Sequence, residues 1–206
     1  MRERHAVNLL RTATPAGEDE SSRAELEGCK THDPAAFRAF VERYQRMVFA
    51  VVSRIAGVGP HVEDLAQEAF LRAYRAFPSF EIDGPARAST WLITIAARLA
   101  LNARRRSSQI AQVVPIDAAA AVRDGTTPEA EGARRELGRA IARAADALPD
   151  DQRAAFVLAE FHGLSIAEIA AVLEAPEATV KTRLFRARAH LRERLAEFQR
   201  DQGDER

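Results

Sequence analysis

The stretch from Gly163 to Arg194 constrains the fold most, because two helical patterns meet there at a proline. Ser165 is followed three residues later by Glu168, a capping-box spacing that predicts where the first helix begins. Pro176 interrupts the pattern, since the residue before a proline avoids the α region, and proline itself suits the first position of a second helix. The stretch therefore predicts a short helix, a bend and a second helix.

The second of these helices has an apolar face and a basic face. Apolar residues recur at i, i+4, i+7 and i+11: Val180, Leu184, Ala187 and Leu191. Hydroxyl, aromatic and basic residues occupy other positions: Thr179, Lys181, Thr182, Arg183, Phe185, Arg186 and Arg188. Such a helix docked on a short one is typical of a DNA-binding helix-turn-helix, in which arginines neutralise phosphates and a few side chains reach base edges. An ordinary solvated basic helix in a bundle is the alternative.

Charge is placed unevenly along a chain whose net charge is +0 over 206 residues. A net charge of zero argues against a general polyanion binder. Five arginines and no acidic residue lie between residues 84 and 116, however, so the chain has a local basic segment. Cys29 is the single cysteine, which excludes an internal disulfide and a cysteine-rich zinc site. No apolar run approaches the ~18 residues of a membrane span, and the N-terminus lacks a signal peptide. These features predict a cytoplasmic protein without membrane insertion.

Helical periodicity without any strand pattern predicts an all-α fold of two helical domains joined by a flexible linker, the second containing the helix-turn-helix. The predicted segments are a flexible N-terminal extension (1–32), a first domain (33–107), a linker (108–126), a second domain (127–197) and a polar tail (198–206). Helices are expected from Asp33–Pro34, over 61–77 and over 91–105, the last capped by Ser89 or Thr90. Asp150 or Asp151 is expected to cap a helix in the second domain.

Two features of the first domain have both a structural and a functional interpretation. The arginines at 104–106 complement the dipole of a helix end, or they form a phosphate-contacting cluster. Trp91 is either a core residue or a ligand contact.

The order of these parts resembles the extracytoplasmic-function (ECF) sigma factors of bacterial RNA polymerase. The likeness rests on the segments 33–37, 64–70, 90–92, 104–106, 148–149, 163–165 and 179–188, and it extends over about residues 33 to 195. The sequence departs from the usual family pattern at the bend, where Glu174 stands in place of a glycine, and in its long N-terminal extension.

The resemblance implies a non-catalytic promoter-specificity subunit that binds core RNA polymerase at the β′ clamp helices and the β flap, melts promoter DNA and needs no cofactor. It implies polymerase contacts at Asp64, Gln67, Glu68 and Leu71. It implies contacts to the −10 region at Ser79, Phe80, Arg87, Trp91, Arg98, Arg104, Arg105 and Arg106, with the loop at 78–88 holding a flipped base. It places the second helix of the helix-turn-helix at the −35 element, and it implies regulation by a separate anti-sigma factor.

Two other classes of protein remain as alternatives. A stand-alone helix-turn-helix regulator would use its N-terminal helices to dimerise or to sense a ligand. A helical enzyme is disfavoured, because the sequence has no glycine-rich phosphate loop, no nucleophile elbow and no His, Cys and Asp cluster at metal-ligand spacing.

Overall fold

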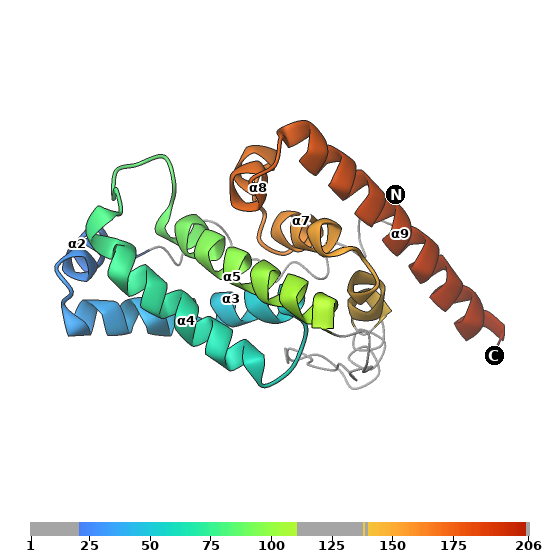
Figure 1. Ribbon diagram of the computed structural model, residues 1–206, viewed down its shortest axis with the longest axis horizontal. Coiled ribbons are helices and arrows are strands. Elements are labelled where there is room, and N and C mark those ends of the chain that lie inside the picture. The colour runs from blue at the N-terminus through green and yellow to red at the C-terminus, as the bar shows by residue number, and fades with distance from the viewer. Residues whose placement is uncertain (1–20, 111–137, 139, 205–206) are drawn as a thin grey trace. The chain divides into compact units, whose positions relative to one another are not determined.

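The computed structural model describes residues 21–110, 138 and 140–204, which fall into two compact units divided after Ile110. All regular elements of these residues are helices (Figure 1), so the all-α prediction is confirmed. Residues 1–20 of the expected extension and residues 111–126 of the expected linker lie outside the described residues.

Helix α3 is the centre of the N-terminal unit. The elements are α2 (Arg23–Lys30), α3 (Pro34–Ala56), α4 (His61–Ala76), the 3-10 helix η1 (Phe77–Ser79) and α5 (Ala88–Ile110). Helix α3 packs against α2, α4 and α5 (Figure 1). It contributes the fully buried side chains Phe40, Val48, Val51, Val52 and Ile55, and α5 contributes Leu92 and Ala96. This apolar core fixes the positions of α2, α4 and α5 around α3.

Local sequence explains where α3 begins and ends. The Asp33 side chain accepts a hydrogen bond from the backbone N–H of Ala36 at 2.7 Å, and Pro34 occupies the first turn. Gly57 ends the helix with a φ of 92°, a conformation open to glycine and strained for other residues. The helix start predicted from Asp33–Pro34 is thus confirmed.

The interpretation of residues 1–32 as a flexible extension is wrong for residues 21–32. Helix α2 occupies most of this segment, with Ser22 as N-cap, and its Leu26 and Cys29 are buried. A Cβ added to Gly28 would lie 2.7 Å from the Cβ of Ala36, so α2 approaches α3 closely where glycine allows it. The N-terminal unit therefore begins about ten residues before the predicted boundary.

The predicted limits of α5 also need correction. Its first turn begins at Ala88, and the N–H of Trp91 donates to the Arg87 carbonyl, so Ser89 and Thr90 lie inside the helix and do not cap it. The helix continues to Ile110, so the expected linker begins at least three residues later than predicted.

The C-terminal unit consists of helical residues 140–146 followed by α7 (Asp150–Glu160), α8 (Ile166–Leu173) and α9 (Glu177–Asp204). Pro149 is the N-cap of α7, and Asp150 and Asp151 lie in its first turn, which corrects the predicted caps. Residues 198–204 of the expected polar tail continue α9 as helix. The buried Arg153 forms an ion pair with Asp146 and so ties α7 to the helix before it.

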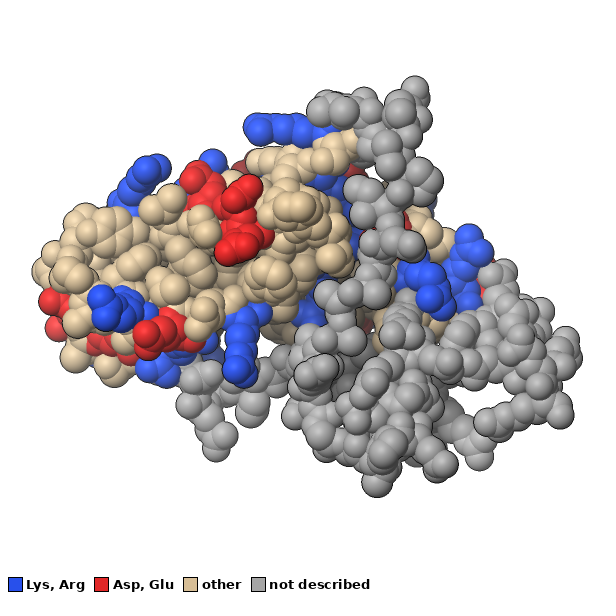
Figure 2. All heavy atoms as spheres, turned by 90° about the horizontal axis from the view of Figure 1, so that it is seen from below, with Lys and Arg blue, Asp and Glu red and all other residues tan. Residues whose placement is uncertain are grey.

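Acidic and basic side chains are interspersed on the described surface of the N-terminal unit that Figure 2 shows, at the left of the view. No single sign of charge dominates this face, in keeping with a net charge of +0.

Candidate nucleic-acid interface

The bend between α8 and α9 has the geometry of a helix-turn-helix. The Ser165 hydroxyl accepts from the Glu168 N–H at 3.2 Å, and the Glu168 carboxylate accepts from the Ser165 N–H at 2.7 Å, which confirms the capping box. Helix α8 ends at Glu174, whose φ of 50° and ψ of 46° are left-handed, and the next N–H, of Ala175, donates to the Ala170 carbonyl at 3.1 Å. Glu174 thus adopts the conformation that glycine usually supplies at this position.

Helix α9 is fixed by its apolar stripe. The stripe residues Val180, Leu184, Ala187 and Leu191 are all buried, as predicted. Ala187 and Leu191 belong to a cluster with Ile141, Ala144, Leu148 and Phe156 from the preceding helices. This packing determines which way the opposite face of α9 points.

The opposite face of α9 carries the candidate −35 contacts. Lys181, Thr182, Phe185 and Arg186 are exposed, and Thr179 is half-buried beside them. Phe185 is 68% exposed, so its ring is accessible to a binding partner. In a major groove an aromatic ring can contact a thymine methyl, and a neighbouring arginine can donate two hydrogen bonds to guanine. The chemistry of this face suits base-edge reading.

Two arginines predicted as DNA contacts pair with acidic residues of α7 instead. Arg183 lies 2.6 Å from the Asp151 carboxylate, and Arg188 donates from two nitrogens to one Glu160 oxygen at 2.8 and 2.6 Å. These ion pairs hold α9 against α7.

A hollow of about 190 Å³ opens in the N-terminal unit beside the loop that precedes α5. Its walls are Ser79, Phe80, Glu81, Gly84, Pro85, Ala86 and Trp91. The Phe80 and Trp91 ring centroids lie 4.8 Å apart, and Phe77 completes the cluster at 5.0 Å from Trp91. The structure thus brings together three predicted −10 residues, Ser79, Phe80 and Trp91, around one concave site with aromatic and polar walls.

The predicted −10 arginines follow α5 away from the hollow. Trp91, Arg98 and Arg105 are spaced by seven residues and therefore share one face of the helix. Arg98, Arg105 and Arg106 are exposed, Arg104 is half-buried, and Arg87 is exposed in the loop just before α5. At 1.5 Å per residue this face runs about 21 Å from Trp91 to Arg105.

The predicted polymerase contacts share one face of α4. Asp64 and Gln67 are exposed, Leu71 is 50% exposed, and Glu68 pairs with Arg72 at 2.7 Å. The spacing i, i+3, i+4 and i+7 places them in one stripe, which combines a carboxylate, an amide and an exposed apolar side chain.

Helix α2 reaches the loop around the hollow, a connection that the sequence analysis missed. Lys30 donates to the Phe80 carbonyl at 2.8 Å, and Arg23 pairs with Asp83 at 2.5 Å. The available signal was Ser22 three residues before Glu25, the spacing of a capping box, followed by apolar Leu26.

The described residues contain no group of three His, Cys, Asp or Glu side chains that could hold a metal ion. Among the helices of the same residues, none has the length and apolar character needed to cross a membrane.

Comparison with known proteins matches both units to one family. Residues 40–110 match the model of sigma-70 region 2, and residues 138–191 match the model of sigma-70 region 4. The chain is 39% identical over 171 residues to the ECF RNA polymerase sigma-E factor of Escherichia coli K12, covering 79% of this chain and 88% of that protein. The chain belongs to the ECF sigma factors. The predicted family is thereby confirmed.

Other relatives of this sigma factor support the same assignment. It is 35% identical over 177 residues to the RNA polymerase sigma-H factor of Pseudomonas aeruginosa, covering 82% of this chain and 91% of that protein. The solved structure of RpoE with the anti-sigma factor NepR from Bartonella quintana gives a TM-score of 0.60 at 25% identity, over 78% of this chain and 96% of that one. The solved structure of CnrH in complex with the cytosolic domain of CnrY gives a TM-score of 0.59 at 27% identity, over 86% of this chain and 99% of that one. As an ECF sigma factor with regions 2 and 4, the protein directs core RNA polymerase to promoters through the −10 and −35 elements.

Proposed function

We propose that the exposed face of α9 reads the −35 element from the major groove. Lys181, Phe185 and Arg186 provide the central contacts, and Thr179 and Thr182 flank them. The observation that carries this proposal is the burial of the Val180 stripe, which leaves the Phe185 side of α9 exposed. Arg183 and Arg188 act indirectly, by holding α9 against α7 through their ion pairs.

The hollow beside Trp91 receives a base extruded from the melted −10 element. An unstacked base gains from contact with aromatic rings, here those of Phe80 and Trp91, while the hydroxyl of Ser79 and the carboxylate of Glu81 offer polar partners. The arginines at 87, 98 and 104–106 then hold the phosphates of the same strand along α5. The α4 face around Asp64 and Leu71 binds the β′ clamp helices of core polymerase, and the C-terminal unit meets the β flap.

The protein acts without chemistry of its own, in the cytoplasm, as part of the polymerase holoenzyme. The region 2 module comprises residues 21–110, and the region 4 module extends from about residue 138 through α9. A separate anti-sigma factor keeps it from polymerase until it is needed, since the RpoE structure contains such a partner.

Run-off transcription with purified core polymerase on a random promoter library tests the proposal. Selected templates should share two blocks of sequence at a fixed spacing, one near −10 and one near −35. Selection of a single block, or transcription of all templates alike, would contradict the assignment of one element to each unit.

A further inference from the structure

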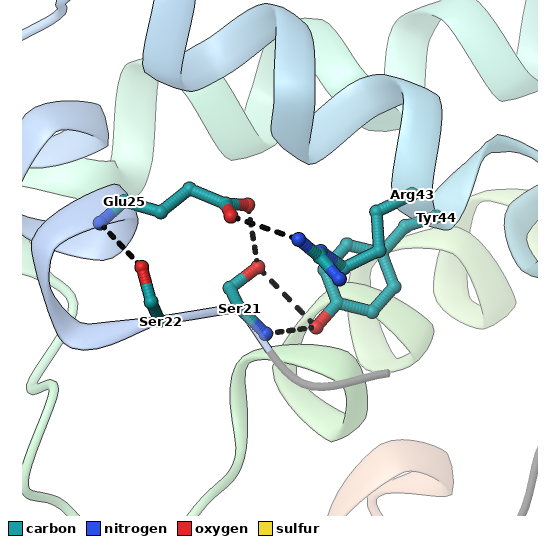
Figure 3. A network of polar contacts seen from close by, with 5 residues as sticks. All are labelled: Ser21, Ser22, Glu25, Arg43 and Tyr44. Atoms are coloured by element: carbon teal, nitrogen blue, oxygen red, sulfur yellow. Dashed lines mark hydrogen bonds and ion pairs between the residues drawn. The ribbon is translucent and has the colours of Figure 1, made fainter. Parts of the chain in front are cut away.

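Helix α2 is held on α3 by a network of polar contacts. The backbone N–H of Ser21 donates to the Tyr44 hydroxyl at 3.2 Å, and the Ser21 hydroxyl donates to Glu25 at 2.8 Å (Figure 3). Arg43 of α3 completes the network with an ion pair to Glu25 at 3.1 Å, and both of these side chains are largely shielded from solvent. The buried Leu26 adds an apolar contact. A helix held in this way can serve as a fixed support for a neighbouring segment.

Helix α2 also contacts the loop at 80–84 at two points, one on each side of the hollow. At its C-terminal end, Lys30 donates to the backbone carbonyl of Phe80, whose ring forms one wall. At its N-terminal end, Arg23 pairs with Asp83, the residue before the wall residue Gly84. Helix α2 also packs against η1, which leads into the same loop. Both ends of the curved segment 80–84 are thus attached to one helix.

The loop has little backbone support from within. Within residues 81–87, all of which the structure describes, a single backbone hydrogen bond runs from the Gly84 N–H to the Glu81 carbonyl at 3.1 Å. Together with the packing of the Phe80 ring on Phe77 and Trp91, the attachments from α2 therefore set the distance between the Phe80 and Gly84 walls. The hydrogen bond and charge of the Arg23 guanidinium also hold the pKa of the Asp83 carboxyl below its usual range, as expected for an ion pair in the folded protein.

We propose that Arg23 and Lys30 are positioning residues for promoter recognition, which set the shape of the base-binding hollow without touching DNA. The inference rests on the proposed role of the hollow. Its consequence is that changes in α2 alter the choice of base at the −10 element, and leave the −35 contacts of α9 unchanged.

Two readouts in the full-length protein test this. Trp91 is the single tryptophan of the chain and lines the hollow, so acrylamide quenching of its fluorescence reports the packing of the loop without any DNA. Run-off transcription by the reconstituted holoenzyme, with each of the four bases at the most sensitive −10 position, reports discrimination as the ratio of best to worst base. The variants are Lys30→Met, Arg23→Glu and the charge swap Arg23→Asp with Asp83→Arg.

Glu27→Gln is the matched control, because Glu27 pairs with the same Arg23 at 2.9 Å but lies on α2 and not on the loop. We expect Lys30→Met and Arg23→Glu to raise Trp91 quenching and to lower the discrimination ratio about two- to fivefold, a modest effect because Arg23 and Asp83 are exposed. The charge swap should recover both readouts, and Glu27→Gln should match wild type.

Unchanged quenching and unchanged discrimination in Lys30→Met and Arg23→Glu would overturn the proposal. A change in only one of the two readouts would also overturn the proposal, because the shape of the hollow would then not determine the choice of base at the −10 position. If the wild-type holoenzyme prefers no base at any −10 position, the role of the hollow itself is wrong and the inference fails with it. That result is distinguishable, since it appears in wild type before any variant is made.

Discussion

Replacing Arg186 with alanine tests the −35 contact at the residue where folding and DNA binding are best separated. Arg186 is exposed on α9, on the side away from the buried stripe, so its loss should leave the free energy of unfolding within about 0.5 kcal/mol of wild type. A bidentate contact from arginine to a guanine edge contributes about 1–3 kcal/mol of discrimination. Since each 1.4 kcal/mol is a factor of ten, −35-dependent transcription should fall about 5- to 140-fold.

Arg188→Ala is the matched control, because it removes the same kind of side chain two residues further along α9, on a different face of the helix. Arg188 pairs with Glu160, so this change should cost about 0.2–1 kcal/mol of stability, typical of surface ion pairs, with little effect on the choice of base. The assay is run-off transcription on the cognate promoter and on a promoter with a scrambled −35 element, together with urea unfolding of each variant.

The expected pattern is specific to the promoter. Arg186→Ala should lose activity on the cognate promoter and show no further loss where the −35 element is already scrambled. Equal losses on both promoters would mean that Arg186 contacts phosphate or polymerase and reads no base. A larger transcription defect in Arg188→Ala than in Arg186→Ala would show that the two arginines are assigned the wrong way round.

Three further predictions concern other parts of the molecule. Glu174→Gly should raise the free energy of unfolding by up to about 1 kcal/mol in urea titrations, because Glu174 has a left-handed φ of 50°; a loss of stability would refute this. Burial raises the pKa of the Cys29 thiol to about 11, so a thiol reagent at pH 7 should modify the native protein far more slowly than the urea-unfolded protein. Equal modification rates would contradict the burial of Cys29. The stability that the neutral thiol contributes should decline as the pH rises above 9, where the thiol of the unfolded chain loses its proton. Leu71→Asp should weaken binding to core polymerase at least about tenfold in a competition assay without changing the unfolding curve; unchanged binding would remove Leu71 from that surface.

The sequence predicted those features that follow from local rules. The stripe beginning at Val180, the break at Pro176 and the capping box at Ser165 all depend on residues close together in the chain, and all three have their predicted places in the structure. The start of α3 at Pro34 belongs to the same group, since a capping aspartate and a proline act within one turn.

The features that sequence reasoning missed depend on contacts between distant residues. The ion pairs of Arg183 and Arg188 are among them, because nothing near these arginines in the chain shows that Asp151 and Glu160 lie on the facing helix. The sequence of α2 does not predict a packed helix, because its buried apolar residues, Leu26 and Cys29, are too few to give a clear period. Their burial comes from α3, and the two links from α2 to the loop at 80–84 join residues that are 50 and 60 positions apart.

Promoter opening measured by permanganate reactivity of unpaired −10 thymines tests the central claim most directly. We expect reactive thymines only when this chain and core polymerase are both present on a promoter with intact −10 and −35 elements. Neither component alone should produce them, because the chain supplies the hollow and the −35 contacts while polymerase supplies the scaffold that aligns them. Absence of reactivity with both components present, or specific opening by the chain alone, would contradict the account.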